Sequence, residues 1–427
     1  MTEPGATDTL TPPEPGFFGR YAIVLRNPVL RRVVPGVLVS SLGDGMSVVA
    51  VAWLAVQLAP VGQRGVWTGL AVAAYALPAT LGALLLGRLV RNLNGPRLVA
   101  VDALLRAVLL GAIPLLHAAH LLTSPRLVLL LAVSSLLHAW GGAGTYTMVA
   151  EALPPRDRVT GNALLSTCGQ LATVIGPALA GVLTAAVGPA WVIGVDAVSF
   201  ALLAVACLTV ANRLPRVAPT LPSDGATGLR TLLRYPRLLA LIAVTFAFFF
   251  LYGPVDVALP VHVAVELHGS ASLLSLYFVV FGIGGIVGGL CAGLLQHRPL
   301  WLVIGAVVTG WGLALLPTGL TDALVPSLAG FAVGGVIYGP FSAISTGLFQ
   351  QSSPPQLLSR ILATRNAMIL PAAALGTALG GPVVGAIGGR DTLLVSALTT
   401  IGLGLLVLVG ALRRTARRPV PDPAGSA

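Results

Sequence analysis

Long runs of apolar residues, separated by short polar segments, follow one another along almost the whole chain. Most runs hold about 20 to 30 residues, which is enough for one α-helix to cross the ~30 Å hydrocarbon core of a bilayer. The runs predict twelve transmembrane helices: 33–59, 66–90, 97–119, 125–152, 158–187, 189–211, 237–265, 271–296, 299–319, 325–350, 357–387 and 391–412. We therefore expect an all-α membrane protein.

A polar segment rich in proline and arginine follows the sixth run and predicts a linker between two six-helix bundles. The bundles share motifs: Asn162 and the later TVIGPALAG in the fifth run match Asn366 and the later TALGGPVVG in the eleventh. Such repeats are typical of transporters, whose binding site lies near the middle of the membrane between the repeats. The predicted domains are a tail at 1–32, bundles at 33–211 and 237–412, a linker at 212–236 and a tail at 413–427.

The composition excludes a soluble protein, because 56% of the residues are hydrophobic and only 9% are charged, whereas soluble proteins carry about 25% charged residues. The net charge of +11 comes from arginines that lie mostly beside apolar runs, which argues against a nucleic-acid partner. Most arginines fall in alternate connecting segments, and these segments include both chain ends. By the positive-inside rule, we expect a multi-pass protein of the cell (inner or plasma) membrane with both termini in the cytoplasm.

The first run carries a carboxyl group, Asp44, near its middle. A carboxylate at that depth costs about 2.5–3.5 kcal/mol on insertion scales, so it usually has a partner or a function. Ser40 and Asp44 share one small, polar helix face, which predicts a face that lines a transport pathway. Burial favours the neutral form of a carboxyl group and a nearby cation favours its charged form, so a group that alternates between the two can bind and release a proton. The alternative is an aspartate that caps local backbone beside Gly43 and Gly45. We interpret Asp196, a buried acid in the sixth run, as structural.

The seventh run carries a second carboxyl group, Asp256, with Tyr252 one helical turn before it. We expect Asp256 to assist in proton coupling, and we expect Asn162 and Tyr338 on later runs to line the same pathway. Aromatic side chains concentrate at the start of the seventh run, which suits a bulky, flat, apolar ligand. The alternative for each of these residues is ordinary packing against neighbouring helices or lipid.

Four stretches of the chain resemble one protein family. They are NPVLRRVVPGVLVSSLGDGMSVVAVAWLAVQL at the first run, GRLVRNLNGPRLVAVDALLRA after the second, EALPPRDRVTGNALLSTCGQLATVIGPALAG before and in the fifth, and PAWVIGVDAVSFALLA in the sixth. Together they resemble the major facilitator superfamily over roughly residues 20–415. Within it, they resemble the drug exporters that include macrolide-efflux and enterobactin-exporter-like proteins. The resemblance implies the major facilitator fold, with twelve transmembrane helices in two six-helix pseudo-repeat bundles.

The resemblance also identifies a conformational motif in the loop after the second run. Gly87, Gly95 and Arg97 match the family pattern, but arginine or asparagine stands at the usual aspartate position. In the family, that aspartate helps to lock the outward-facing state. Asp102 precedes Arg106 by four residues, so the two can pair along one helix face and replace the lock. The alternative is a neutralised pair that only stabilises the cytoplasmic end of the helix.

Gly176, Pro177 and Gly181 in the fifth run resemble the motif that marks exporters in this family. Proline bends a helix because it removes a backbone hydrogen bond, and the glycines allow a neighbouring helix to approach closely. Generic packing of glycine and proline is the alternative. In the fourth run, His138 precedes a run of glycines. The resemblance implies a basic residue there that takes part in proton transfer, and the alternative is a histidine that only packs.

We expect a secondary active transporter that works by alternating access and couples proton movement to the efflux of hydrophobic small molecules, such as drugs, antibiotics or natural products. The alternatives are a siderophore or polar-metabolite transporter on the same scaffold, and a membrane scaffold protein without transport. The sequence contains no Walker motif, no cluster of metal ligands and no nucleophile arrangement, so we expect no enzyme activity and no cofactor. The expected partners are the substrate, the proton and membrane lipid, and we expect a monomer.

Overall fold

The computed structural model of the protein describes residues 17–90, 92–214, 235–295, 298–353 and 358–416. All regular structure within these residues is helical, which confirms the expected all-α class. Most of the predicted linker and parts of both predicted tails lie outside the described residues.

The helices follow one another with short connections. Those of the first half are α1 (Phe17–Arg26), α2 (Leu30–Leu58), α3 (Arg64–Leu85), α4 (Gly87–Val90), α5 (Gly95–Ala118), α6 (Ser124–Ser134), α7 (His138–Ala152), η1 (Pro155–Asp157), α8 (Arg158–Val187), α9 (Pro189–Val210) and η2 (Ala211–Arg213). Those of the second half are α11 (Pro236–Val261), η3 (His262–Glu266), α12 (Ala271–Leu290), η4 (Cys291–Leu295), α13 (Leu300–Leu320), α14 (Leu324–Tyr338), α15 (Phe341–Ser352) and α16 (Leu358–Ala416).

Eleven helical segments of the described chain are long and apolar enough to cross a bilayer, and the last of them, Pro371–Arg413, is long enough for two crossings. The two crossings are separated at Gly388, whose φ of 84° does not occur in an α-helix. Glycine adopts this conformation freely because it has no Cβ. With that division the segments form twelve crossings, as the sequence predicted.

Equivalent interruptions occur in both halves. The fourth predicted helix is broken between α6 and α7, and the tenth is broken between α14 and α15. Gly188, between α8 and α9, has the same φ of 84° as Gly388 within α16. The spans predicted at 125–152 and 325–350 correspond to Ser124–Ala152 and Leu324–Ser352, and each contains a local break, which leaves the apolar run intact. The matching interruptions agree with the repeated halves.

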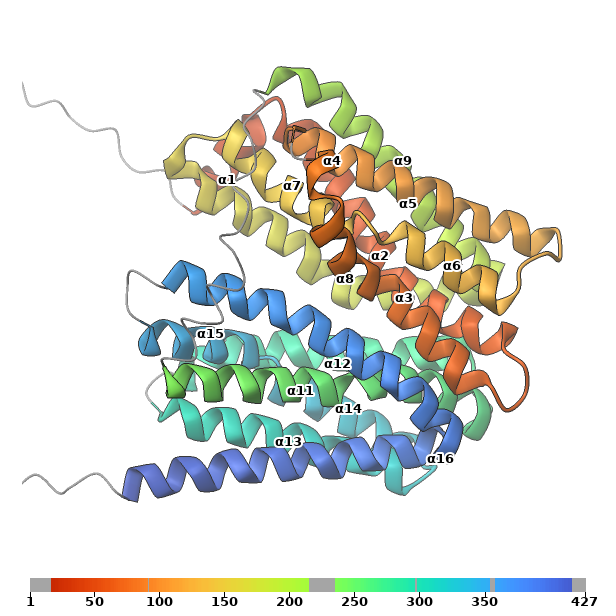
Figure 1. Ribbon diagram of the computed structural model, residues 1–427, viewed down its shortest axis with the longest axis vertical. Coiled ribbons are helices and arrows are strands. Elements are labelled where there is room, and N and C mark those ends of the chain that lie inside the picture. The colour runs from red at the N-terminus through yellow and green to blue at the C-terminus, as the bar shows by residue number, and fades with distance from the viewer. Residues whose placement is uncertain (1–16, 91, 215–234, 296–297, 354–357, 417–427) are drawn as a thin grey trace, which may run out of the picture.

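Figure 1 shows α1 to α9 in one group and α11 to α16 in another, with α1 and the last turns of α16 at the same end of the molecule. In the first group α2 packs on α8 and α9, and α5 packs on α9. In the second group α16 packs on α11 and α13, and α12 packs on α14. The groups are joined mainly by α3 with α16 and α8 with α12, and less extensively by α3 with α11 and by α2 with α11 and α12. Because α2 is the most buried of the crossing segments, it occupies the centre of the first group.

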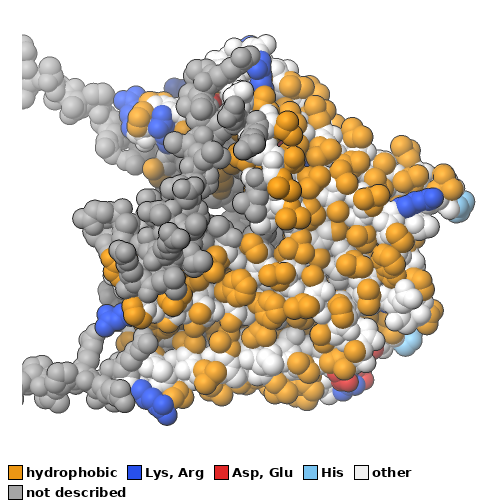
Figure 2. Space-filling view, viewed as in Figure 1, with side chains coloured by type: hydrophobic (Ala, Val, Ile, Leu, Met, Phe, Trp, Pro, Cys, Tyr) orange, Lys and Arg blue, Asp and Glu red, His pale blue; other side chains and the backbone are white. Residues whose placement is uncertain are grey.

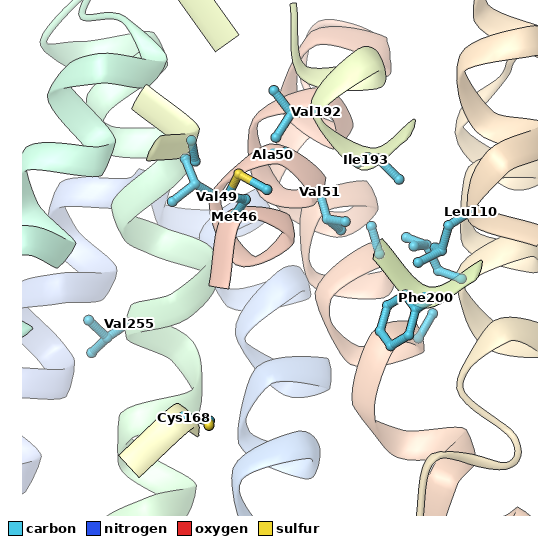
Figure 3. Packing of buried hydrophobic residues seen from close by; sticks show 14 of the residues in the cluster. Met46, Val49, Ala50, Val51, Leu110, Cys168, Val192, Ile193, Phe200 and Val255 are labelled. Atoms are coloured by element: carbon cyan, nitrogen blue, oxygen red, sulfur yellow. The ribbon is translucent and has the colours of Figure 1, made fainter. Parts of the chain in front are cut away.

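Apolar side chains fill the interior and also cover the outside. Met46, Val49 and Val51 of α2 belong to one packed cluster with Leu110 of α5 and Phe200 of α9 (Figure 3). On the displayed face, apolar side chains cover the middle and the charged side chains lie toward its ends (Figure 2). Lipid cannot hydrate a charge, so a surface of this kind suits the interior of a bilayer. The chain is therefore a multi-pass membrane protein.

Candidate functional site

Asp44, in the middle of α2, binds two side chains from neighbouring helices. Its Oδ1 accepts a hydrogen bond from the Tyr75 hydroxyl of α3 at 2.6 Å and another from Arg106 Nη1 of α5 at 2.7 Å. Hydrogen bonds to a charged partner are roughly twice as strong as neutral ones. The Arg106 side chain is 1% exposed, whereas that of Asp44 is 34% exposed. The arginine is therefore enclosed by protein, while one edge of the carboxyl group remains accessible.

Aromatic rings hold the Arg106 guanidinium from two sides. Its central carbon lies 5.2 Å from the centroid of the Tyr75 ring and 4.8 Å from that of Phe200 on α9, within the range of cation–π attraction. The sequence analysis expected Arg106 to pair with Asp102, four residues earlier. That contact measures 3.9 Å between Nε and Oδ1. Asp44 is therefore the closer partner of Arg106, and Asp102 the more distant one.

Asp102 connects this arginine to His138. The His138 Nδ1 lies 3.9 Å from Asp102 Oδ2, and the His138 side chain is 46% exposed at the start of α7. Gly141 makes the approach of α5 and α7 possible, because a Cβ at that position would lie 2.1 Å from Asp102 Oδ2. A series of contacts therefore leads from an exposed histidine through Asp102 and Arg106 to the middle of α2.

Asp196 of α9 also binds α2. It is fully buried, and its two carboxyl oxygens accept hydrogen bonds from Ser47 Oγ at 2.5 Å and Ser199 Oγ at 3.1 Å. Gly43 packs directly on this carboxyl group, since a Cβ there would lie 2.1 Å from Asp196 Oδ1. Ser47 stands one helical turn after Asp44. Asp196, interpreted from the sequence as structural, is thus attached to the same part of α2 as Asp44.

The polar cluster of the first half contains three carboxyl groups but one arginine. Asp44, Asp102 and Asp196 supply the acids, Arg106 supplies the permanent cation, and His138 is partly exposed beside them. Charges buried in a low-dielectric environment are stable only when they are paired. With all three carboxyl groups ionised the cluster would carry excess negative charge. Its chemistry therefore suits the binding and release of a proton.

Two other predicted pathway residues make no hydrogen bond to this cluster within the described part of the chain. Ser40 is buried on α2, one turn before Asp44. Asn162 on α8 is partly buried, and its Oδ1 has no hydrogen-bond partner among the residues that the structure describes. Their role in a transport pathway stays a prediction.

Three predicted residues come together in the second half. Asp256 on α11 is partly buried and stands one helical turn after Tyr252. The rings of Tyr252 and Tyr338 lie 6.2 Å apart, and Tyr252 stacks on Trp311 at 5.8 Å. No hydrogen bond or ion pair joins Asp256 to another residue of the described chain. Asp256 therefore differs from Asp44, whose charge has a partner within the protein.

The Gly176–Gly181 motif brings α8 into contact with two neighbours. A Cβ on Gly176 would lie 2.6 Å from the Cα of Gly45, so the backbones of α8 and α2 touch at this point. Pro177 is buried beside it. One turn further, the carbonyl oxygen of Gly181 accepts a hydrogen bond from Ser272 Oγ of α12 at 2.9 Å. The motif thus contacts both the helix that carries Asp44 and the second half of the molecule.

A carboxyl group of another helix, that of Glu151 on α7, lies beside the loop motif between α3 and α5. Gly95 packs so closely on α7 that a Cβ would lie 2.5 Å from the Met148 nitrogen. Its N–H donates to Glu151 Oε2 of α7 at 3.1 Å, and a carboxylate is favourable at the start of a helix. Arg97 donates to Asn212 Oδ1 at 2.8 Å. Glu151 thus places a carboxyl group beside a loop in which the family's usual aspartate is replaced.

Gly87 and Asn94 position the two ends of this loop. A Cβ on Gly87 would lie 3.0 Å from the Trp140 ring. Asn94 is buried, caps α5 by accepting from the Arg97 N–H, and donates to the Ala211 carbonyl oxygen at 2.6 Å. The sequence analysis missed Asn94, although an Asn before Gly-Pro is a helix-start signal. It also missed Tyr75, a single tyrosine in an apolar run for which no sequence signal exists.

Comparisons with known proteins agree with this architecture. A family model described as Major Facilitator Superfamily matches residues 33–377. The chain is 28% identical over 412 residues to the multidrug efflux pump Tap of Mycobacterium bovis (strain BCG / Pasteur 1173P2), and the match covers 91% of this chain and 96% of the pump. It is 29% identical over 311 residues to the enterobactin exporter EntS of Citrobacter koseri, covering 68% of this chain and 72% of the exporter.

Solved structures show the same fold at low sequence identity. A bacterial homologue of the human lysosomal transporter Spinster, in an inward-facing and unoccupied conformation, matches with a TM-score of 0.69 at 12% identity, over 92% of this chain and 99% of that one. The nucleoside transporter NupG matches with a TM-score of 0.68 at 14% identity, over 90% of this chain and 99% of that one. The resemblance inferred from the sequence motifs is thereby confirmed.

Proposed function

The chain belongs to the Major Facilitator Superfamily, and from this premise we propose that it is a proton-coupled exporter of hydrophobic small molecules. Export is supported by two relatives, which are named as a multidrug efflux pump and an enterobactin exporter, and by the resemblance of the Gly176–Gly181 motif to that of exporters. The distribution of arginines supports a place in the cell membrane with both termini in the cytoplasm. We further propose that the protein works as a monomer surrounded by lipid.

The observation that carries the proposal is the contact between Asp44 and the buried Arg106. Asp44 is the accessible member of the pair, since its side chain is 34% exposed. When Asp44 takes up a proton, the short ion pair is lost, and Arg106 keeps Asp102 as a carboxyl neighbour at 3.9 Å. When the proton leaves, the pair with Asp44 forms again. The arginine thus alternates between carboxyl groups on two helices, α2 and α5, and His138 assists by exchanging protons near Asp102.

The backbone contact between α2 and α8 supports a link from this exchange to a change of shape. Gly45 follows Asp44 directly and packs against Gly176. A shift of α2 on protonation therefore acts on α8, and α8 contacts α12 of the second half through Gly181 and Ser272. Because packed interfaces tend to have a few discrete arrangements, a small shift at Asp44 can favour one arrangement of the two halves over another.

The close contacts between the halves support an assignment of the described state. A Cβ on Gly69 of α3 would lie 2.6 Å from the Cα of Gly381, and one on Gly65 would lie 2.7 Å from the Gly385 nitrogen. If the N-terminus is cytoplasmic, these residues lie at the outer ends of their helices. Gly169, in the cytoplasmic half of α8, has open space beside it. We infer a state that is closed toward the outside, and alternating access would separate the α3–α16 contact.

A drug-accumulation panel in bacterial cells tests the proposal. Cells that express the wild type, Asp44→Asn or Asp391→Asn are loaded with ethidium, tetracycline, erythromycin or chloramphenicol, and retention is followed with and without a protonophore. The wild type should lower retention of at least one compound, and the protonophore should abolish the effect. Asp44→Asn should remove most of the efflux, whereas Asp391→Asn, an exposed carboxyl group on α16, should keep it. Efflux by Asp44→Asn at the wild-type rate would contradict the role of Asp44.

Siderophore export is the second candidate, because the enterobactin exporter EntS is among the relatives. The two candidates differ in substrate chemistry, since enterobactin is a polar, iron-binding catecholate. Secretion of catecholates into the medium of a siderophore-producing host that lacks its own exporter distinguishes them. Restored secretion together with unchanged drug retention would favour this second candidate.

A further inference from the structure

Aromatic side chains from four helices meet at the centre of the second half. Trp311 contacts three other rings of this aromatic cluster. The centroid of its ring lies 5.2 Å from that of Phe281, 5.8 Å from that of Tyr252 and 6.2 Å from that of Tyr338. Phe248 extends the cluster, with its ring 6.0 Å from that of Tyr338. Trp311 and Phe248 are 1% exposed, whereas Tyr252, Phe281 and Tyr338 are partly exposed. The buried rings thus support a set of accessible ring faces.

Asp256 is the acid of this region. It stands one helical turn after Tyr252 on α11, and the rings of Tyr252 and Tyr338 lie 6.2 Å apart. It is partly exposed, so a small ligand can reach it. The structure shows no hydrogen bond or ion pair for Asp256 within the described residues.

Three charged or titratable side chains on the elements around α11 have partners other than Asp256. Arg365 of α16, the helix that packs on α11, lies 5.4 Å from the Phe349 ring and 3.4 Å from Ser345 Oγ. Arg390 binds Asp322 and backbone carbonyl groups at the α13–α14 connection. His262, at the end of α11, is paired with Glu266. No ion pair joins Asp256 to a basic side chain of the described residues, so an ionised carboxylate there gains from a cation that a ligand brings.

Ring faces and a carboxylate together define the ligand chemistry. The face of an aromatic ring carries partial negative charge and attracts a cation, most strongly where water is excluded. A carboxylate at membrane depth gains most from a partner of opposite charge. A neutral ligand would fill the space between the rings but leave the charge of Asp256 without compensation. The combination favours a ligand with a cationic centre inside an apolar, aromatic body.

We propose that Asp256 and the ring faces of Tyr252 and Tyr338, supported from behind by Trp311, bind the cationic centre of a hydrophobic aromatic substrate. This inference rests on the proposed function as an exporter of hydrophobic small molecules and names the substrate class. It also assigns proton exchange to the first half and binding of the substrate's cationic centre to the second half. In the first half Arg106 compensates Asp44, so protons are exchanged there, and in the second half the substrate itself compensates Asp256.

Binding of a permanent cation tests the inference without interference from ligand protonation. The full-length protein in nanodiscs is titrated with radiolabelled tetraphenylphosphonium, and triphenylphosphine oxide, a neutral compound of similar shape, serves as competitor. The wild type should bind the cation more tightly than the neutral compound. Asp256→Asn should weaken tetraphenylphosphonium binding at least about tenfold and lose the preference for the cation, whereas Asp391→Asn should bind it as the wild type does.

Two further variants keep the test decisive if Asp256→Asn does not fold. Asp256→Glu retains the charge and should retain the preference for the cation, and Tyr338→Leu should weaken binding of the cation more than that of the neutral compound. Equal binding of the cation by Asp256→Asn and the wild type would overturn the inference. A wild type that exports neutral compounds but does not bind tetraphenylphosphonium would also overturn it and leave the proposed function intact. Failure to export any compound would instead remove the proposed function.

Discussion

The contact between Asp44 and Arg106 is expected to contribute measurably to the stability of the first half. Asp44→Asn leaves the guanidinium of Arg106, which is 1% exposed, with Asp102 as its ion-pair partner at 3.9 Å. Removal of one member of a buried ion pair costs about 3–5 kcal/mol. Because Asp102 remains and Asp44 is itself partly exposed, we expect a loss near the lower end, about 3 kcal/mol of unfolding free energy.

Removal of the other partner should cost less. Arg106→Met keeps an apolar side chain of similar length between the Tyr75 and Phe200 rings and leaves a carboxyl group that can become neutral by binding a proton. We expect a loss of about 1–2 kcal/mol, below the range for a fully buried orphan charge. The double variant contains neither charge, so its loss should be smaller than the sum of the single losses by about 1–3 kcal/mol, as for side chains in direct contact.

Equilibrium unfolding in mixed micelles of dodecylmaltoside and SDS measures these differences. The four proteins of the double-mutant cycle are compared with Asp391→Asn, which removes an exposed carboxyl group and should change stability by less than about 0.5 kcal/mol. Strictly additive losses in the double variant would show that Asp44 and Arg106 do not interact energetically. That result would refute the reasoning from the 2.7 Å contact.

Three further predictions follow from close backbone contacts and buried hydrogen bonds. Gly176→Val places a side chain against Gly45, so it should cost about 1–3 kcal/mol of stability and abolish efflux. Gly402 has open space around it, so Gly402→Val should change neither stability nor efflux. Equal effects of the two substitutions would contradict the α2–α8 contact. Gly69→Leu should separate α3 from α16. An impermeant maleimide added outside should then label a cysteine introduced at Val66 faster than it does when Gly69 is unchanged, with the exposed Cys291 replaced by serine in both proteins. Unchanged labelling would argue against closure at this point. Asn94→Ala removes a helix cap and a buried hydrogen bond to Ala211, so it should lower stability by about 1–2 kcal/mol. The control Asn92→Ala, at an exposed position, should leave stability unchanged. An Asn94→Ala protein as stable as the wild type would show that the cap is dispensable.

The fold could be predicted from the sequence because each crossing needs about 20 apolar residues, and the lipid enforces that length on every helix. The repeat could be recognised because both halves carry the same glycine and proline pattern, whereas the linker stays a prediction. The breaks between α6 and α7 and between α14 and α15 were not predictable in this way. They interrupt backbone hydrogen bonds without adding a polar residue run, so the hydropathy of the segment does not change.

The candidate site could be predicted only in part. The cost of charge in lipid selected Asp44, helical spacing selected the Asp102–Arg106 pair, and the structure places all three in one cluster with His138. Helical spacing favoured Asp102 as the partner of Arg106, because it describes contacts within one helix. The shorter contact with Asp44 joins residues 62 positions apart, and this distance depends on how α2 and α5 pack. The role of Asp44 and His138 in proton coupling and that of Asp102 and Arg106 in conformational change remain predictions.

Glu151 illustrates the same limit at the loop between α3 and α5. Its carboxyl group reaches Gly95 across 56 residues of sequence, so the apparent absence of an acid in the loop motif said nothing about the space around it. An acid that is missing from a local motif can be supplied by a distant segment of the chain.

Substrate-dependent proton movement in proteoliposomes tests whether Asp44 couples protons to transport. The purified protein is reconstituted with a pH-sensitive dye inside the vesicles, a proton gradient is imposed, and a compound exported in the cell panel is added. We expect the compound to accelerate collapse of the gradient with the wild type and with Asp391→Asn but not with Asp44→Asn. Transport of the compound by the wild type without any change in proton flux, or proton flux through Asp44→Asn equal to that of the wild type, would contradict this coupling.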